Sequence, residues 1–120
     1  MMKNAMTMIF PLNSDYMTTV RLATGGICSL AELNLDDSED CKVCVTESLL
    51  VFMRNGFASA RLVFTCGEGL SVQIYAEGLP AAQPSVEDEI SFALLGALVS
   101  DLSMQKTDGC VSEISFRFGS

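Results

Sequence analysis

The sequence predicts an α+β protein, a two-layer α/β sandwich with helices on one face of a mixed, mainly antiparallel sheet. Three segments alternate apolar and polar residues, as strands with one buried face do. Three others repeat apolar residues every three or four positions behind capping residues, as helices do. The resulting order is strand, two helices, two strands, helix, strand. The 120 residues are enough for one domain, 1–120, with a real core.

The first half of the chain predicts a strand and two helices. The strand is expected over Met6–Phe10, before a proline. A helix should then begin at Ser14 or Asp15 and run to about Leu33. Gly25-Gly26 lies inside this helix, where glycine is unfavourable. The pair is therefore expected to mark a close contact between helix and sheet.

The second helix has the clearest sequence pattern. Asp36-Asp37-Ser38-Glu39 resembles a capping box, and its carboxylates suit the positive end of the helix dipole. An apolar stripe is expected through Val43, Leu50 and Met53, with Val45, Leu49 and Phe52 beside it. Gly56 then marks the end of the helix.

The second half predicts a hairpin, a loop, a helix and a last strand. Ala60–Thr65 and Leu70–Tyr75 alternate on either side of a glycine turn, and a Gly- and Pro-containing loop follows. A second capping-box pattern at Ser85–Asp88 opens a helix. The apolar positions expected to line this helix are Ile90, Leu94, Leu95, Leu98 and Leu102. After a turn at Asp108-Gly109, Cys110–Phe118 should close the sheet.

The charge balance and the absence of histidine exclude several functions. The chain has 7 Lys and Arg against 15 Asp and Glu, a net charge of −8, and no His. Such a charge repels nucleic-acid backbones and anionic lipid surfaces, so neither is an expected partner. Catalytic triads that need histidine and His-ligated metal sites are excluded. No apolar run is long enough to cross a membrane and no secretory signal is recognisable, so a cytoplasmic protein is expected.

The five cysteines are expected to be free, buried thiols. An odd number in apolar segments is atypical of a secreted disulfide scaffold and typical of small core residues. Cys41 and Cys44 form a C-x-x-C pair, for which redox and zinc roles are alternatives. Both are disfavoured, because acidic neighbours raise thiol pKa values and no second ligand pair exists. The cluster Asp36–Asp40 lacks the spacing of a calcium loop and is expected to be a solvated helix start.

Two segments resemble a known family. Met8-Ile9-Phe10-Pro11 with Asp15–Arg21 is similar to the opening of the anti-sigma-factor serine kinases, members of the GHKL (histidine kinase-like, Bergerat-fold) ATPase superfamily. Asp36–Ser48 resembles the family's second helix, which carries an ATP-binding motif called the N box. The element order matches over nearly the whole chain. The resemblance implies the histidine kinase-like ATPase fold for a single GHKL-like domain.

The positions that bind ATP and magnesium in the family are mostly altered. The N-box Glu falls on Glu47, where it would orient water near the γ-phosphate, but the magnesium-ligating Asn is replaced by Val51. Asn55, two turns from Glu47, is about 12 Å away along the helix and too distant to substitute. In the adenine-binding Asp-x-Gly motif, Ala76 stands for the Asp and only Gly78 is kept.

The start of the third helix completes the contrast with the family. Where a Gly-rich phosphate loop is expected, Glu87–Phe92 carries carboxylates and no glycine. No residue is therefore a confident catalytic, cofactor-binding or metal-binding residue.

The expected function is a regulatory protein-binding module without nucleotide binding, a pseudo-kinase in transcription regulation. The resemblance implies a sigma factor or an anti-sigma antagonist as partner, and a homodimer. Seven Met and an apolar first helix also favour a partner or a second copy. The alternatives are an ATP- and Mg-dependent anti-sigma-factor serine/threonine kinase and an unrelated α/β sandwich.

Overall fold

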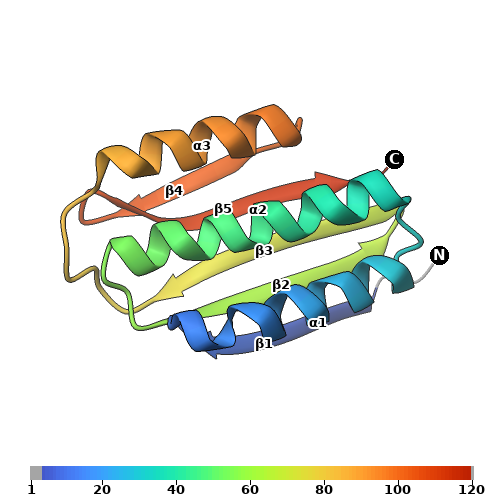
Figure 1. Ribbon diagram of the computed structural model, residues 1–120, viewed down its shortest axis with the longest axis horizontal. Helices are drawn as coiled ribbons and strands as arrows, with labels where there is room; N and C mark the ends of the chain where they lie inside the picture. The colour runs from blue at the N-terminus through green and yellow to red at the C-terminus, as the bar shows by residue number, and fades with distance from the viewer. Residues whose placement is uncertain (1–3, 120) are drawn as a thin grey trace.

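The computed structural model describes residues 4–119, which form a five-stranded sheet covered on one face by three helices (Figure 1). The elements in chain order are β1 (Asn4–Pro11), a short 3₁₀ turn (Ser14–Tyr16), α1 (Met17–Leu30), α2 (Leu35–Arg54), β2 (Ser59–Gly67), β3 (Gly69–Glu77), α3 (Val86–Leu98), β4 (Ser103–Thr107) and β5 (Cys110–Phe118). The strands lie in the order β1-β2-β3-β5-β4, and every pairing is antiparallel. The predicted α+β two-layer architecture, with the first and last strands in one sheet, is confirmed.

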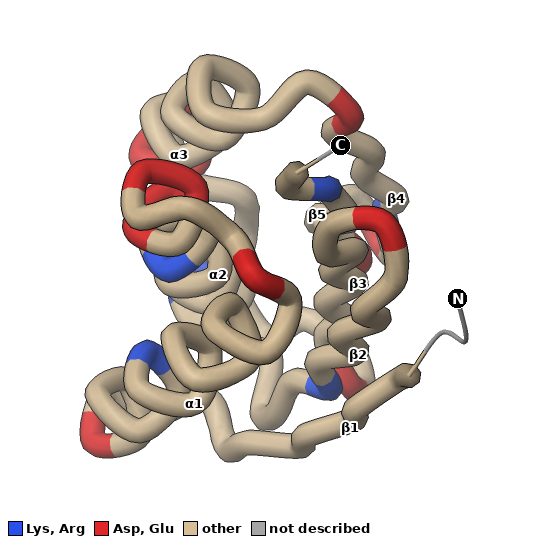
Figure 2. The backbone as a smooth tube through the Cα atoms, turned by 90° about the vertical axis from the view of Figure 1, so that its right-hand side faces the viewer, with Lys and Arg blue, Asp and Glu red and all other residues tan. Residues whose placement is uncertain are grey.

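The two layers differ in charge, as Figure 2 shows from the side. Residues 14–54 and 85–99, which contain the helices, hold ten Asp and Glu against three Lys and Arg, a net charge of −7. The negative charge of the chain is therefore concentrated on the helical face.

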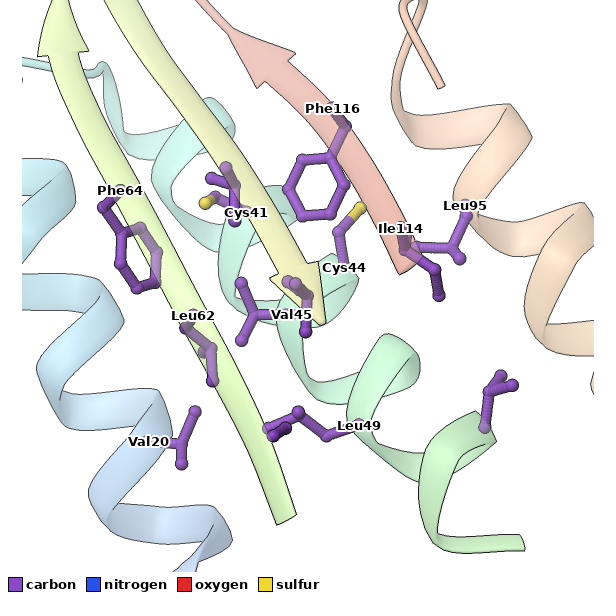
Figure 3. Packing of buried hydrophobic residues seen from close by; sticks show 14 of the residues in the cluster. Val20, Cys41, Cys44, Val45, Leu49, Leu62, Phe64, Leu95, Ile114 and Phe116 are labelled. Carbon is purple, nitrogen blue, oxygen red and sulfur yellow. The ribbon is translucent and has the colours of Figure 1, made fainter. Parts of the chain in front are cut away.

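The core lies between the sheet and α2, which crosses the central strands (Figures 1 and 3). The register places Leu62 of β2 opposite Ile74 of β3, and Ile74 opposite Ile114 of β5, so all three face the helices. Their side chains are fully buried. Alternation along the strands therefore gives the sheet one apolar face, as predicted.

The buried side of α2 contains Val45, Leu49 and Phe52, as predicted, but the prediction was wrong for three other residues. Val43 is 40% exposed, and Leu50 and Met53 are half-buried. The residues that α2 buries are Cys41, Cys44, Val45, Ser48, Leu49, Val51 and Phe52. The prediction was wrong because cysteine packs as a small hydrophobe, and because Ser48 satisfies its hydroxyl by donating to the Cys44 carbonyl at 2.8 Å.

The prediction for α1 was wrong at Gly25-Gly26. A Cβ on Gly25 would meet only the Lys42 side chain of α2, at 3.6 Å, and a Cβ on Gly26 would meet nothing within 4 Å. The pair therefore marks no close approach to the sheet. The helix caps also differ: Asn13 caps the turn before α1, and Asn34 caps α2 by accepting from Asp37 N at 2.8 Å.

The third helix is shorter than predicted, and a strand follows it. α3 ends at Leu98, because Val99 is already extended, so Leu102 lies outside the helix. β4 was not predicted, since its short segment is mostly polar and exposed. It is held by pairing with β5 through the Asp108-Gly109 turn, where both residues have positive φ, as a tight hairpin requires. In residues 4–119, no helix combines the length and apolarity needed to span a bilayer.

Candidate functional site

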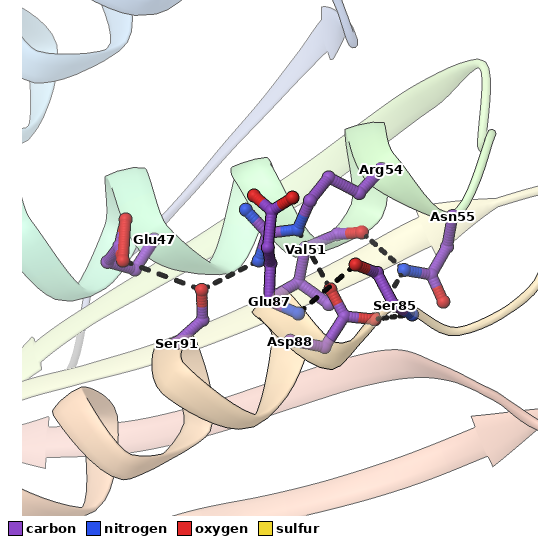
Figure 4. A network of polar contacts seen from close by, with 8 residues as sticks. All are labelled: Glu47, Val51, Arg54, Asn55, Ser85, Glu87, Asp88 and Ser91. Carbon is purple, nitrogen blue, oxygen red and sulfur yellow. Dashed lines mark hydrogen bonds and ion pairs between the residues drawn. The ribbon is translucent and has the colours of Figure 1, made fainter.

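The candidate site lies where α3 packs beside α2 (Figure 4). We call it the α2–α3 seam and define it by Glu47, Arg54 and Asn55 of α2 together with Ser85, Asp88 and Ser91 at the start of α3. The Ser85 capping box predicted from the sequence is confirmed and fixes the first turn of α3. In it, Ser85 Oγ accepts from Glu87 N and Asp88 Oδ2 accepts from Ser85 N, both at 3.1 Å.

Asp88 is the centre of the seam. Its side chain is almost fully buried and forms an ion pair with Arg54, whose Nε donates to Oδ1 at 2.9 Å. Asn55 Nδ2 donates to the other carboxylate oxygen at 2.9 Å. With the bond from Ser85 N, three donors from two elements converge on one carboxylate. Asp88 therefore holds the last turn of α2 against the first turn of α3.

Further hydrogen bonds extend the seam along both helices. Arg54 Nη2 donates to Ser91 Oγ at 2.7 Å, and Ser91 in turn directs its hydroxyl to Glu47 Oε1 at 3.5 Å. Asn55 Nδ2 also donates to the Val51 carbonyl, while its Oδ1 is buried without a partner among residues 4–119. The Asn55 backbone carbonyl accepts from Ala81 N and Ala82 N at 3.1 Å, so the loop before α3 is tied to the same point.

The electrostatics of Asp88 follow from these contacts. Burial alone would raise the pKa of its carboxyl, but hydrogen bonds from Asn55 and Ser85 and the Arg54 guanidinium outweigh that effect. The pKa of Asp88 therefore lies below its ordinary value, and the group is an anion at neutral pH. A buried anion matched by one cation and two neutral donors is a stabilising arrangement only while all of them stay in place.

Glu47 lies on α2 as expected but has little to act upon. It is half-buried, and its contact in the seam is the long one with Ser91. On the α1 side it borders a shallow groove of about 170 Å³ that Arg21 and Lys42 also line. Typical ligand pockets begin at about 300 Å³, so this groove is small for a nucleotide.

The other positions assigned by the resemblance have structural roles. Val51 is fully buried in the core and carries no oxygen for a hard cation. Ala76 packs against the core near the end of β3, beside Ala60 of β2. Gly78 has a φ of +86° and ends β3 in a turn, with open space around it. Val51 touches the seam through its backbone carbonyl, which accepts from Asn55 Nδ2.

The three carboxylates at the start of α3 are not equivalent. The sequence suggested that Glu87, Asp88 and Glu89 together would oppose phosphate. Glu87 and Glu89 are exposed, but Asp88 points inward and forms an ion pair with Arg54. The seam residues Arg54, Asp88 and Ser91 were not recognised as a unit from the sequence, because their partners lie 34 and 37 positions apart. The sequence signal that could have identified them is the spacing of Asp88 and Ser91, two polar residues one turn apart in a largely apolar helix.

The cysteines are free thiols, and four of the five are buried. Cys28 of α1 lies against Cys41 of α2; their hydrogen bond, burial and nearby acidic groups raise the pKa of the Cys41 thiol. Burial, Asp40 and Glu47 raise the pKa of Cys44 to about 12. Raised thiol pKa values disfavour the thiolate, so Cys41-x-x-Cys44 has the character of core packing.

Comparisons with known proteins identify no family for this chain. No protein-family model matches the chain, and a search of curated proteins finds no match. Within residues 4–119, no three His, Cys, Asp or Glu side chains gather as a metal site would require. The function must therefore be argued from the seam and from the surface around it.

Proposed function

We propose that this protein is a regulatory protein-binding module of the cytoplasm that does not use a nucleotide, similar in role to anti-sigma factors. The observation that carries the proposal is the filled α2–α3 seam. The resemblance puts the nucleotide beside α2, near Glu47 and the start of the third helix. There, Arg54 donates hydrogen bonds to both Asp88 and Ser91.

Opening this seam for a nucleotide would be costly. Separating α3 from α2 would break the hydrogen bonds that Arg54 and Asn55 donate to the Asp88 carboxylate, and a hydrogen bond to a charged group contributes about 1.5–3 kcal/mol. The triphosphate would also bring negative charge to Glu87 and Glu89. Each like-charge contact adds on the order of 1–4 kcal/mol at surface dielectrics.

The partners we propose are proteins. By resemblance, a sigma factor or an anti-sigma antagonist is the expected class, with a homodimer as the expected assembly in transcription regulation. The exposed side of α1 supports self-association, because Leu22 and Leu30 are 72% and 71% exposed on one uncharged helix face. No Lys, Arg, Asp or Glu interrupts that face between them.

The alternative function is an ATP- and Mg-dependent serine/threonine kinase acting on an anti-sigma antagonist. Glu47 is the residue that favours it, since it occupies the position of the catalytic Glu. Isothermal titration calorimetry with ATP and Mg²⁺ separates the two functions. We expect no binding heat at millimolar nucleotide, whereas a micromolar dissociation constant would replace the proposed function with the kinase.

A further inference from the structure

α3 turns two polar residues inward beside Phe92, Leu95 and Leu98, and leaves other apolar residues on its outer side. The residues it buries are Asp88, Ser91 and Leu95, two of them polar. Val86, Ile90 and Leu94 are 84%, 71% and 37% exposed, although they are among the apolar residues of this helix. Amphipathic helices in globular proteins have the opposite arrangement.

The exposed apolar residues form one continuous strip. We call it the α3 outer stripe and define it as Val86, Ile90, Ala93, Leu94 and Ala97, which are all exposed. Their spacing of four, three, one and three places them on one side of the helix. The stripe spans about 17 Å, which is three helical turns.

The seam explains why this stripe points outward. Rotating α3 to bury Ile90 and Leu94 would take Asp88 away from Arg54 and Asn55, which its carboxylate bonds at 2.9 Å. Polar contacts therefore fix the rotation of the helix and hold an apolar surface in water. An exposed stripe of this kind is typical of a binding surface.

Charge around the stripe indicates its partner. Glu87 and Glu89 are exposed on either side of its first turn, and Asp101 follows its last turn. Residues 62–105 contain no Lys or Arg at all. All the charged residues of the segment 85–101 are carboxylates, so the strip complements an apolar strip bordered by cations.

A second copy of the chain fits this stripe poorly. In a parallel pairing, Glu87 and Glu89 of the two copies would meet each other. In an antiparallel pairing, they would meet the negative C-terminal end of the other helix and its Asp101. Anionic lipid would be repelled in the same way.

We propose that the α3 outer stripe binds a cationic amphipathic helix of another protein. The proposal rests on the proposed protein-binding function and names the chemistry of the partner. The partner helix would place apolar residues at i, i+3 or i+4, and i+7 on Ile90 and its neighbours. Its Lys or Arg side chains would face Glu87 and Glu89.

The test uses an 18-residue helical peptide of Leu and Lys with a fluorescent label, and a matched peptide with Glu in place of Lys. Binding to the full chain is followed by fluorescence anisotropy. We expect only the cationic peptide to bind, and Ile90→Gln to weaken binding at least about tenfold, because that contact buries one large apolar side chain. Ile9→Gln is the matched control, since Ile9 is 66% exposed on β1, at one edge of the sheet, and it should change binding less than twofold.

A second pair of variants tests the charges. Glu87→Gln with Glu89→Gln should weaken binding several-fold. Glu32→Gln with Glu68→Gln should not, because both residues are exposed and lie in the α1–α2 and β2–β3 connections. Circular dichroism checks that each variant folds. If Ile90→Gln does not fold, shifts of the backbone amide signals of the unmodified chain on peptide addition must cluster within 86–97.

Several results would overturn the inference. They are an absence of peptide binding, equal losses in Ile90→Gln and Ile9→Gln, equal binding of the Glu peptide, or an unmodified homodimer that Ile90→Gln dissociates. Binding to phosphatidylcholine vesicles that Ile90→Gln abolishes would assign the stripe to a membrane instead. These outcomes leave the calorimetry with ATP and Mg²⁺ unaffected, so failure of this inference is distinguishable from failure of the proposed function.

Discussion

Replacing Asp88 with Asn tests whether the seam holds α3 in place. The substitution keeps the shape of the side chain but removes the charge opposite Arg54. It also turns an acceptor toward Asn55 into an amide that can present a donor. Because Asn keeps one acceptor oxygen, the change leaves either Arg54 or Asn55 without its acceptor, and it leaves the guanidinium without its counter-charge.

The expected loss of stability is about 3 kcal/mol at pH 7. Removing one partner of a buried ion pair costs about 3–5 kcal/mol, and the lower end applies because the Arg54 side chain is 24% exposed and can reach water. With an m-value of about 1.5 kcal/mol/M, the urea midpoint should fall by about 2 M. Urea unfolding followed by circular dichroism measures it.

The loss should depend on pH in a defined direction. The pKa of Asp88 is lower in the folded chain than in the unfolded chain, where it is about 3.9. The Asp88 carboxylate therefore contributes its full stabilisation above the unfolded-state pKa and loses it as the pH falls through the folded-state pKa. The difference in free energy of unfolding between the unmodified chain and Asp88→Asn should therefore be constant from pH 7 to about pH 5 and become smaller below about pH 4.

Glu87→Gln is the control, since Glu87 is adjacent but exposed and interacts chiefly with the helix dipole. It should cost less than about 1 kcal/mol. A double-mutant cycle of Asp88→Asn with Arg54→Gln should show strong coupling. This account of the seam would be refuted if Asp88→Asn lost less than about 1 kcal/mol of unfolding free energy at pH 7. It would also be refuted if the unfolding free energies of the two chains differed as much at pH 3 as at pH 7.

Three further predictions concern other parts of the chain. Gly69→Ala should destabilise by more than about 1 kcal/mol, because Gly69 has a φ of +85° and its Cβ would collide with the Phe118 carbonyl oxygen, and thermal denaturation measures this. In the same assay Gly96→Ala, in open space on α3, should stabilise by about 0.5–1 kcal/mol, so a loss there would contradict the helix geometry. A disulfide-exchange reagent should label the half-buried Cys66 first in the native chain and all five thiols only in denaturant; a count of three or one in denaturant would reveal disulfides.

The strands and their burial were predictable because alternation is a local signal. Leu62, Val72 and Phe116 fall on the inner face that their spacing required. β4 was missed because an edge strand with little apolar content is defined by its pairing with β5, which the sequence does not display. The capping box at Ser85 was predictable, since all its partners lie within three residues.

The faces of the helices were harder to predict than their positions. α2 and α3 are apolar around much of their circumference, so spacing alone did not decide which side turns inward. In α3 the decision depends on Asp88 and its contacts with Arg54 and Asn55, more than 30 positions away. Glu47 was placed correctly on α2, but the side chains that meet it could be known only from the packing of two distant segments.

The attachment of α3 has a consequence for how the native chain opens. Among the large apolar side chains of α3, Leu95 is fully buried and Phe92 and Leu98 are partly buried, so the hydrogen bonding of the first two turns is an important part of what holds the helix. Opening a unit with so little buried apolar area costs less than global unfolding. Its amide hydrogens should therefore exchange with solvent well before those of β2, β3 and β5, and a protease should first cut the chain on either side of this helix.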